Sequence, residues 1–339
     1  MSKKHPYYKF NYVLSFNAIF NFLVGGRGIG KTYGATKLAI EDAVYRGNQF
    51  IYLRRYKTEM APARNTFFTP FADKFPRWDF RVVGNEAQCA PARTRDNKKR
   101  QWRTIGYFLV LSNAQTQKSV SYQHVRTIIF DEFIIEKGLL RYLPDEADVF
   151  TNFYSTVDRW NDRVRVFFLA NSVSIMNPYF LKYNIRPDQD GELVVRDNGF
   201  VLCHFIESEA FKTSVFETRF GKFIAGTEYA EYAVGNQFDD NHDSLINVKD
   251  AKMRYQYTLE TRTGTFSVWN DVLTGEFFVQ AKLPKRQLVF TMLADRMTSE
   301  KILMTLSDRP LGILRTAFTH GRVTFDAPST RNTFAEIFK

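Results

Sequence analysis

A glycine-rich stretch in the first part of the chain has the composition and spacing of a phosphate-binding loop. It reads Gly25-Gly26-Arg27-Gly28-Ile29-Gly30-Lys31-Thr32, which matches the pattern G-x-x-x-x-G-K-[ST]. Glycines let the backbone turn so that its N–H groups face phosphates, and a following helix adds its positive N-terminal end. We expect the loop to bind ATP, with Lys31 at the outer phosphates and the Thr32 hydroxyl on Mg²⁺. The alternative is a glycine-rich turn in an ordinary strand–helix unit.

Two acidic residues, Asp131 and Glu132, close the apolar run 127–130. Ligands of a parallel sheet bind at the carboxyl ends of its strands. We therefore expect Asp131 beside the Mg²⁺ and Glu132 near the γ-phosphate, where it could polarise and orient the attacking water. An apolar run can end in acids by chance, but together with the phosphate loop this pair indicates a hydrolase. Glu132 favours hydrolysis over phosphate transfer to a small molecule.

Further polar residues could couple or sense hydrolysis. Asn171 follows an apolar run and could sense the γ-phosphate, or it could cap a helix or turn. Lys118 could reach a phosphate of its own or of a neighbouring subunit, or it could be a solvated loop lysine. An arginine inserted into a neighbour's site can stabilise charge in the transition state, for which Arg159, Arg163 and Arg165 are candidates. A solvated surface position is the more common fate of any single arginine.

The elements that must position these residues alternate along the first half of the chain. Short runs rich in Val, Ile, Leu and Phe suit a parallel sheet that is covered on both faces. Because helical stretches separate them, they predict a doubly wound α/β domain with a mostly parallel sheet. The expected strands are 20–24, 49–53, 104–111, 127–130 and 165–169, and the expected helix is 31–45.

A hairpin is predicted within 81–111, where two strand-like segments flank the polar stretch 93–103. That stretch carries six basic residues and one acid. On a hairpin tip, such a cluster could grip phosphates without reading bases. A solvated charged loop is an equally good interpretation.

The second half of the chain has a different organisation. Segment 207–240 is punctuated by Gly221, Gly226 and Gly235 and predicts a small linker subdomain. The expected domains are therefore 1–206, 207–240 and 241–339. Within the last, Thr263-Gly264 and Thr274-Gly275 are turn signals. They separate expected strands at 254–260, 266–269, 276–280 and 287–292, which a helix at 299–306 follows.

Length, composition and net charge limit the kinds of partner and the cellular setting that we expect. The 339 residues carry a net charge of +11 and are 44 % hydrophobic, enough for two cores. The charge indicates a polyanionic partner or simply a basic surface that binds nothing. The two cysteines, Cys89 and Cys203, lie far apart, so neither a disulfide framework nor a zinc site is expected. There is no apolar run of about 20 residues, so we expect no membrane partner and a cytoplasmic setting.

Several stretches resemble the DNA-packaging ATPases of phi29-like bacteriophages, which are small relatives of the large terminase subunits. The similarity covers roughly residues 15–240 and is weak beyond them. The stretches are NFLVGGRGIGK (21–31), QFIYLRRYK (49–57), TIIFDEF (127–133), NPYF (177–180), TRFG (218–221), GTEY (226–229) and NQF (236–238). Several of these are not general features of phosphate-loop proteins, which makes the resemblance specific.

The resemblance implies an ATP-driven translocase that packages double-stranded viral DNA into a preformed capsid. It would act in the host cytoplasm as a homo-oligomeric ring of five subunits at the portal vertex of the prohead, and some relatives dock on a packaging RNA. It also implies an ATPase domain of the additional-strand, catalytic-glutamate (ASCE) class, a linker and an α+β RNase H-like carboxyl-terminal domain that meets DNA and portal.

The same resemblance implies roles for individual basic residues. Arg159 corresponds to an arginine finger that acts in trans, and Lys118 to a second basic residue at the subunit interface. Arg54 and Lys57 fall where the family places basic residues near the ATP interface. Nuclease activity is not expected, because strands 254–260 and 266–269 carry no central aspartate and Asp271 lies just past the second of them.

Two other functions fit the motifs. A phosphate-loop helicase or an AAA+-like remodelling ATPase would share the nucleotide site, and a strand-displacement assay would separate a helicase from a duplex translocase. A nucleotide-gated structural protein would bind ATP with little turnover, and DNA-stimulated phosphate release would exclude it.

Overall fold

The computed structural model describes residues 7–94, 100–117, 120–135, 142–143, 145–171, 177–185, 192–227, 230 and 246–338. The chain divides into two compact units. The first combines Met1–Val173 with Pro187–Gln237, and the second combines Ser174–Arg186 with Phe238–Lys339. Among the described residues, no helix is both long and apolar enough to cross a membrane.

The described strands of the first unit form one nine-stranded sheet. They are β1 (Phe20–Gly25), β2 (Gln49–Arg54), β3 (Trp78–Val83), β4 (Glu86–Pro91), β5 (Arg103–Val110), β6 (Val125–Asp131), β7 (Arg165–Ala170), β8 (Leu193–Arg196) and β9 (Val201–Ile206). Their order is β3-β4-β5-β2-β6-β7-β1-β9-β8. The run from β5 to β9 is parallel, and β3, β4 and β8 pair in antiparallel fashion at the edges. The carboxyl ends of the parallel strands therefore meet at one edge of the sheet.

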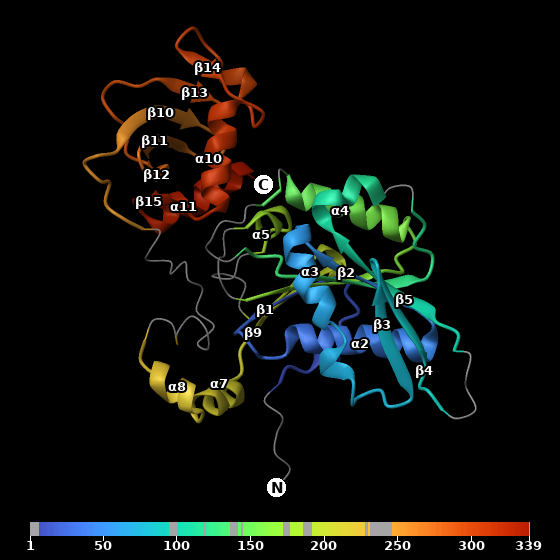
Figure 1. Cartoon of the computed structure of the whole chain (residues 1–339). Helices are drawn as coiled ribbons and strands as arrows, with labels where there is room; N and C mark the ends of the chain where they lie inside the picture. Colours follow the sequence, from blue (N-terminus) through green and yellow to red (C-terminus); the bar gives the residue numbers. More distant parts are fainter. Residues whose placement is uncertain are drawn as a thin grey trace. The chain divides into compact units, whose positions relative to one another are not determined.

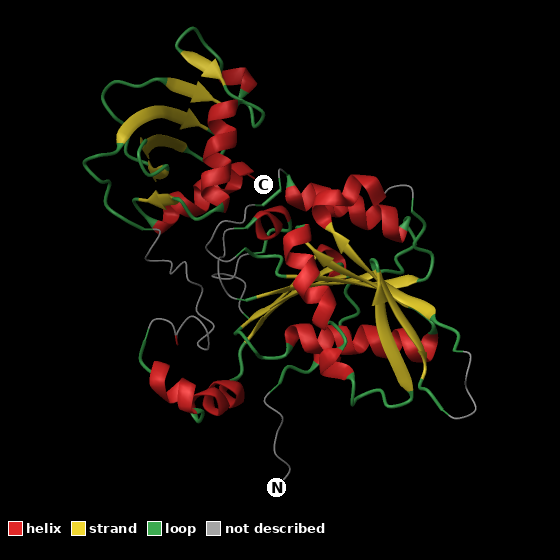
Figure 2. Cartoon of the chain, viewed as in Figure 1, coloured by secondary structure: helices red, strands yellow, loops and turns green. Residues whose placement is uncertain are grey.

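Helices cover both faces of this sheet, as Figures 1 and 2 show for α2 (Lys31–Arg46) below it and α4 (Glu146–Asp158) above it. The small residues Ala35, Ala39 and Ala43 of α2 are buried against one face. Phe150 of α4 stacks at 5.7 Å on Phe130 of β6 at the other. Apolar cover on both faces explains why the central strands are almost fully apolar. The other helices of the unit are α1 (Phe10–Leu14), α3 (Lys57–Thr66), α7 (Glu209–Phe216), α8 (Arg219–Ile224) and the short 3-10 turns η1 (Thr69–Phe71), η2 (Leu111–Gln117) and η3 (Asp197–Gly199).

The expected strands 20–24, 49–53, 104–111, 127–130 and 165–169 are confirmed as β1, β2, β5, β6 and β7. The expected hairpin is confirmed as the antiparallel pair β4–β5, and a third strand, β3, joins it. Residues 95–99 of its polar stretch lie outside the described residues. The hairpin β8–β9 was not predicted, although 201–206 is a buried apolar run beside β1. A polar turn, Asp197–Gly199, separates its two strands.

Described residues of the second unit form a six-stranded mixed sheet. Its strands are β10 (Arg254–Glu260), β11 (Thr265–Asp271), β12 (Glu276–Gln280), β13 (Val289–Thr291), β14 (Lys301–Leu303) and β15 (Val323–Phe325), in the order β14-β13-β10-β11-β12-β15. The helices are α5 (Pro178–Lys182), α10 (Arg309–Thr319) and α11 (Pro328–Ala335), with 3-10 turns η5 (Ala294–Arg296) and η6 (Glu336–Phe338). Leu311, Leu314 and Phe318 of α10 pack with Val268 and Val279 in one core. The four strands expected between 254 and 292 are thus confirmed.

The helix expected at 299–306 is wrong. Lys301–Leu303 is instead β14, which pairs in parallel with β13. Lys301 reaches β10, where its Nζ lies 3.2 Å from the Glu260 carboxylate. Strand pairing and this ion pair therefore outweigh the weak helical spacing of the apolar residues. The helix starts later, at Arg309, with Pro310 in its first turn, a common helix-start signal.

Candidate nucleotide site

The predicted phosphate loop connects β1 to α2. Gly28 and Gly30 have φ values of 85° and 94°, in the left-handed region that favours glycine. Gly30 is the N-cap of α2, so the loop runs directly into the positive end of a 16-residue helix. The ring of Phe211 from α7 lies 3.6 Å from the position that a Cβ on Gly28 would take. Glycine is therefore favoured at positions 28 and 30, because the loop backbone is left-handed there.

Lys31 is folded back onto the loop. Its Nζ donates to the carbonyl oxygens of Gly25 at 2.8 Å and Gly26 at 2.9 Å, and to Asn171 Oδ1 at 3.3 Å. The residue is only 6 % exposed. Burial lowers the pKa of this ammonium to about 8, while nearby Asp131 opposes the shift. The structure thus brings together two residues that were predicted separately, Lys31 and Asn171.

Asp131 ends β6 and accepts two hydrogen bonds. Its Oδ1 accepts from Thr32 Oγ1 at 2.9 Å, and its Oδ2 accepts from the Tyr52 hydroxyl at 2.6 Å. Burial, and next the charge of Asp131, raise the pKa of Tyr52, so the phenol remains a donor. Thr32 and Asp131 were each predicted to lie at the Mg²⁺, and the structure places them in contact. Tyr52 was missed, although one tyrosine in the otherwise apolar run 50–53 was a visible signal.

Glu132 lies just past β6 with a left-handed backbone, at φ 59°. Its side chain is half exposed, and Oε2 lies 2.6 Å from Arg54 Nη1 at the end of β2. Burial disfavours the charge of Arg54, but Asp131, Tyr52 and Glu132 outweigh it and raise the pKa of the guanidinium. Arg54 was expected near the ATP interface, and it lies against both acidic residues of the site.

A buried ion pair supports the strained backbone of Glu132. Arg55 is 1 % exposed, and its Nε and Nη2 bind the Glu146 carboxylate at 2.7 and 2.9 Å. The same guanidinium donates to the carbonyl oxygens of Phe133 at 2.7 Å and Glu132 at 3.3 Å. Glu146 is the first residue of α4, so these contacts of Arg55 also fix the start of that helix. Sequence reasoning missed both Arg55 and Glu146.

Arg159 lies far from the loop of its own chain. It caps the carboxyl end of α4, whose 13 residues span about 20 Å. It therefore sits at the amino ends of the strands, whereas Lys31 and Glu132 sit at their carboxyl ends. Arg159 is exposed, and its guanidinium has no hydrogen-bond partner among the described residues.

The other two arginine candidates are engaged with the backbone. Arg163 donates to the carbonyl oxygens of Val125 and Val157, each at 2.6 Å. Arg165 donates to Ala18 O at 3.2 Å. Lys118 lies outside the described residues, and Lys57 lines a cavity beside α3.

The class of the protein follows from the sheet and the site. It is an α/β protein whose mostly parallel sheet carries the predicted phosphate loop after β1 and two acids after β6, and β7 lies between these two strands. The whole chain, residues 1–339, matches the family model described as Podovirus DNA encapsidation protein (Gp16). The chain belongs to this family, which confirms the resemblance and DNA packaging as the family's function.

Individual relatives agree with this assignment. The chain is 35 % identical to the DNA packaging protein of Bacillus phage PZA, over 99 % of this chain and 98 % of that one. Its identity to the DNA packaging protein of Bacillus phage phi29 is 34 %, with the same coverage. It is also similar to a chain of the bacteriophage phi29 genome packaging motor assembly, with a TM-score of 0.62 and 34 % identity over 98 % of this chain and 99 % of that one. The N-terminal domain of the phi29 DNA packaging ATPase matches 61 % of this chain and all of its own, with 37 % identity and a TM-score of 0.53.

Proposed function

We propose that this protein hydrolyses ATP to drive double-stranded DNA through the portal into a preformed capsid. The observation that carries the proposal is the convergence of Lys31, the Thr32–Asp131 pair and Glu132 at one edge of the sheet. Motor function is tested by ATP-dependent movement of duplex DNA into portal-bearing proheads. If the protein instead used ATP to separate the two DNA strands and did not move duplex DNA, it would be a helicase.

The loop residues and the acid pair suit a triphosphate with its Mg²⁺. The N–H groups of the glycine loop and the start of α2 favour negative charge, and Lys31 adds a cation. Thr32 and Asp131 place two oxygen atoms 2.9 Å apart, and Mg²⁺ prefers oxygen ligands with most of its shell left to water and phosphate. Tyr52 holds the second oxygen of Asp131 and so fixes its orientation.

Glu132 is proposed to orient and polarise the attacking water. Its ion pair with Arg54 at 2.6 Å orients the carboxylate, and its half-exposed side chain can be reached by water. Asn171 contacts the Lys31 ammonium and is proposed to respond to the γ-phosphate through it. Lys118 remains a proposed second basic residue at the interface.

Arg159 is proposed to act on a neighbouring subunit. Because α4 carries it to the opposite edge of the sheet from its own loop, it can serve a nucleotide only in another copy. A head-to-tail contact of this kind closes into a ring when its rotation allows. The proposal includes a homo-oligomeric ring, five subunits by resemblance, at the prohead portal vertex in the host cytoplasm.

The second unit and the basic loop complete the proposal. The unit at the carboxyl end is proposed to be RNase H-like and to meet DNA or portal, after a linker near 207–240. Its Glu260 is ion-paired with Arg296 and Lys301, which argues against a nuclease role for that acid. The basic loop 93–103 is proposed to contact DNA or a packaging RNA through its charge. At its end, Arg81 of β3 and Arg100 of the loop lie over the Trp102 ring at 4.1 and 5.1 Å.

A first prediction concerns pH. The pKa of Lys31 is lowered to about 8, so the ammonium loses its proton as pH rises through that value. Since the cation attracts the triphosphate, ATP affinity should fall between pH 7 and 9, by about tenfold at one unit above the pKa. Titration with a fluorescent ATP analogue measures this. The Lys31→Arg variant keeps its charge and should not show the fall, and an equal fall in that variant would refute the assignment.

A second prediction separates stability from positioning at Arg55. Glu146→Leu leaves a buried, uncompensated guanidinium and should lower the free energy of unfolding by about 3–5 kcal/mol. Combining it with Arg55→Met should recover most of that loss, because an apolar pair can replace a buried ion pair. Turnover should stay low in the double variant, because the carbonyl oxygens of Glu132 and Phe133 have lost their donor. Denaturant titration and phosphate release measure the two effects, and full turnover in the double variant would exclude the positioning role.

A further inference from the structure

Trp160 is the residue after Arg159 and is almost entirely exposed, at 91 %. The turn that presents it is well ordered by hydrogen bonds. Buried Asp158 accepts from four successive main-chain N–H groups, those of residues 161, 162, 163 and 164, at 2.8 to 3.0 Å. Trp160 itself has a left-handed backbone, at φ 59°. A large aromatic side chain held out from the surface by a braced turn is typical of an interface anchor.

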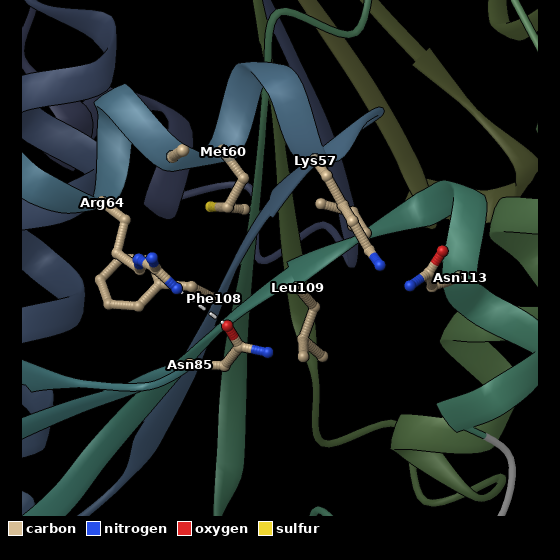
Figure 3. A pocket seen from close by; sticks show the side chains of 9 residues that line it. Lys57, Met60, Arg64, Asn85, Phe108, Leu109 and Asn113 are labelled. Carbon is tan, nitrogen blue, oxygen red and sulfur yellow. Dashed lines mark hydrogen bonds between the residues drawn. The ribbon is translucent and has the colours of Figure 1, made fainter.

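An open cavity of about 360 Å³ lies beside α3, at the carboxyl ends of β2 and β5 (Figure 3). Its apolar wall is formed by Met60, Phe108 and Leu109. Lys57 and Asn113 point toward one another across it in Figure 3.

Arg64 is fixed at the other side of this cavity by hydrogen bonds to Gly84 O at 2.8 Å and Asn85 Oδ1 at 3.0 Å. An apolar wall, amide oxygens and a nearby ammonium suit an indole ring, which offers an apolar body, one N–H donor and a π face that attracts cations.

Trp160 and this cavity face opposite ways in one chain. The cavity is at the carboxyl edge of the sheet, and Lys57 follows Arg54 by only three residues. Trp160 is at the amino edge, a 13-residue helix away from Glu146. The indole can therefore fill this cavity only in another copy of the chain, in the head-to-tail contact that the proposed ring requires. In that contact, Arg159, which precedes Trp160 in the chain, would lie at the carboxyl edge of the copy that holds the cavity.

The proposed triphosphate would give the two edges complementary charges. At the amino edge, Arg126 and Arg163 both donate to the main-chain carbonyl oxygen of Val125, an uncharged acceptor that leaves their positive charge in place. At the carboxyl edge, Arg54 lies against Asp131 and Glu132, so the negative charge there would come from the proposed triphosphate. Opposite potentials steer such surfaces together.

We propose that Trp160 of one subunit docks into the Lys57–Asn113 cavity of the next and so sets the position of Arg159 at that neighbour's nucleotide. The partner is a second copy of this chain. This inference rests on the proposed function, because it assigns a contact within the proposed ring.

Cross-linking between chains tests the contact directly. Trp160→Cys and Asn113→Cys are made in separate chains, which are mixed with ATP and treated with a short bis-maleimide. The two natural cysteines are buried, so they interfere little. The expected result is a covalent dimer only when both variants are present. As a matched control, Tyr45→Cys, at an exposed position of α2, replaces the Trp160 variant and should give no dimer with Asn113→Cys. The docking would be overturned if light scattering showed that rings form while no covalent dimer between the Trp160→Cys and Asn113→Cys chains appears.

Turnover gives a second readout. Trp160→Ala should lower ring ATPase activity at least tenfold while leaving the affinity of single chains for ATP unchanged, and Trp160→Phe should restore part of the activity. Full activity in Trp160→Ala would overturn the positioning of Arg159. If no assembly forms, the docking fails as well, whereas ATP turnover by the unmodified chain reports separately on the proposed function.

Discussion

Replacing Glu132 with glutamine is expected to leave ATP bound and almost unhydrolysed. Glutamine has the same shape but cannot accept a proton, and loss of a positioned general base costs about 10²- to 10⁴-fold in rate. The phosphate loop, Lys31 and the Thr32–Asp131 pair are untouched by this change, so affinity for the nucleotide should stay within a few fold of the natural chain. The left-handed backbone of residue 132 is fixed by Arg55 and not by the carboxylate, so the fold should also be preserved.

Phosphate release under single-turnover conditions and equilibrium binding of a fluorescent ATP analogue measure the two properties. Lys31→Ala is the matched contrast, because it removes the cation and should weaken binding itself. Hydrolysis by Glu132→Gln at close to the natural rate would mean that another group activates the water. In that case the carboxylate would serve only to anchor Arg54.

The second large effect is expected at Arg159. An arginine that completes a neighbour's site contributes about 10³- to 10⁵-fold to hydrolysis in related phosphoryl-transfer systems. Arg159→Ala should therefore abolish ring ATPase activity, although each chain still binds ATP. Arg163→Ala offers a nearby comparison, because that guanidinium holds main-chain oxygens and its loss should act on stability.

Mixing two inactive variants shows whether the arginine acts in trans. An Arg159→Ala subunit keeps an intact Glu132, and a Glu132→Gln neighbour can supply the missing guanidinium. With random assembly of equal amounts, about a quarter of the contacts should pair the two in the productive order. Phosphate release by the mixture, well above that of either variant alone, is the expected result. A mixture as inactive as its components would contradict action in trans without affecting the assignment of the nucleotide site.

The parts of the site that are local in sequence could be predicted. The loop 25–32 and the acids after 127–130 are short motifs next to their own strands, so spacing alone located them. Tyr52 left a weak local signal, a tyrosine in an apolar run, whereas the Arg55–Glu146 pair could not be predicted from spacing. Arg55 and Glu146 lie 91 positions apart, and only the parallel pairing of β2 with β6 places Arg55 against the backbone of Glu132.

The fold followed the same division. Most strands with a continuous apolar run were predicted correctly, because burial on both faces of a parallel sheet leaves a strong signal, and β9 is the exception. The short β14 was mistaken for a helix, since three residues carry little periodicity and its pairing with β13 is a tertiary effect. The true helix nearby, α10, begins where Pro310 stands, a local signal that was overlooked.

The placement of α4 bears on the order in which the subunits of a ring hydrolyse ATP. Its first residue is anchored, through Arg55, to the segment that carries Glu132, and its last turn presents Arg159. In the proposed ring, a displacement at one end of this helix would be passed to the other, so a change at one subunit's nucleotide would reach, through Arg159, the neighbour whose site that arginine completes. A ring built from such subunits has an inherent sense of rotation. Phosphate release can be measured in rings that contain one Glu132→Gln subunit. Hydrolysis should be inhibited in only one of the two subunits that flank it, and equal inhibition of both would argue against this directionality.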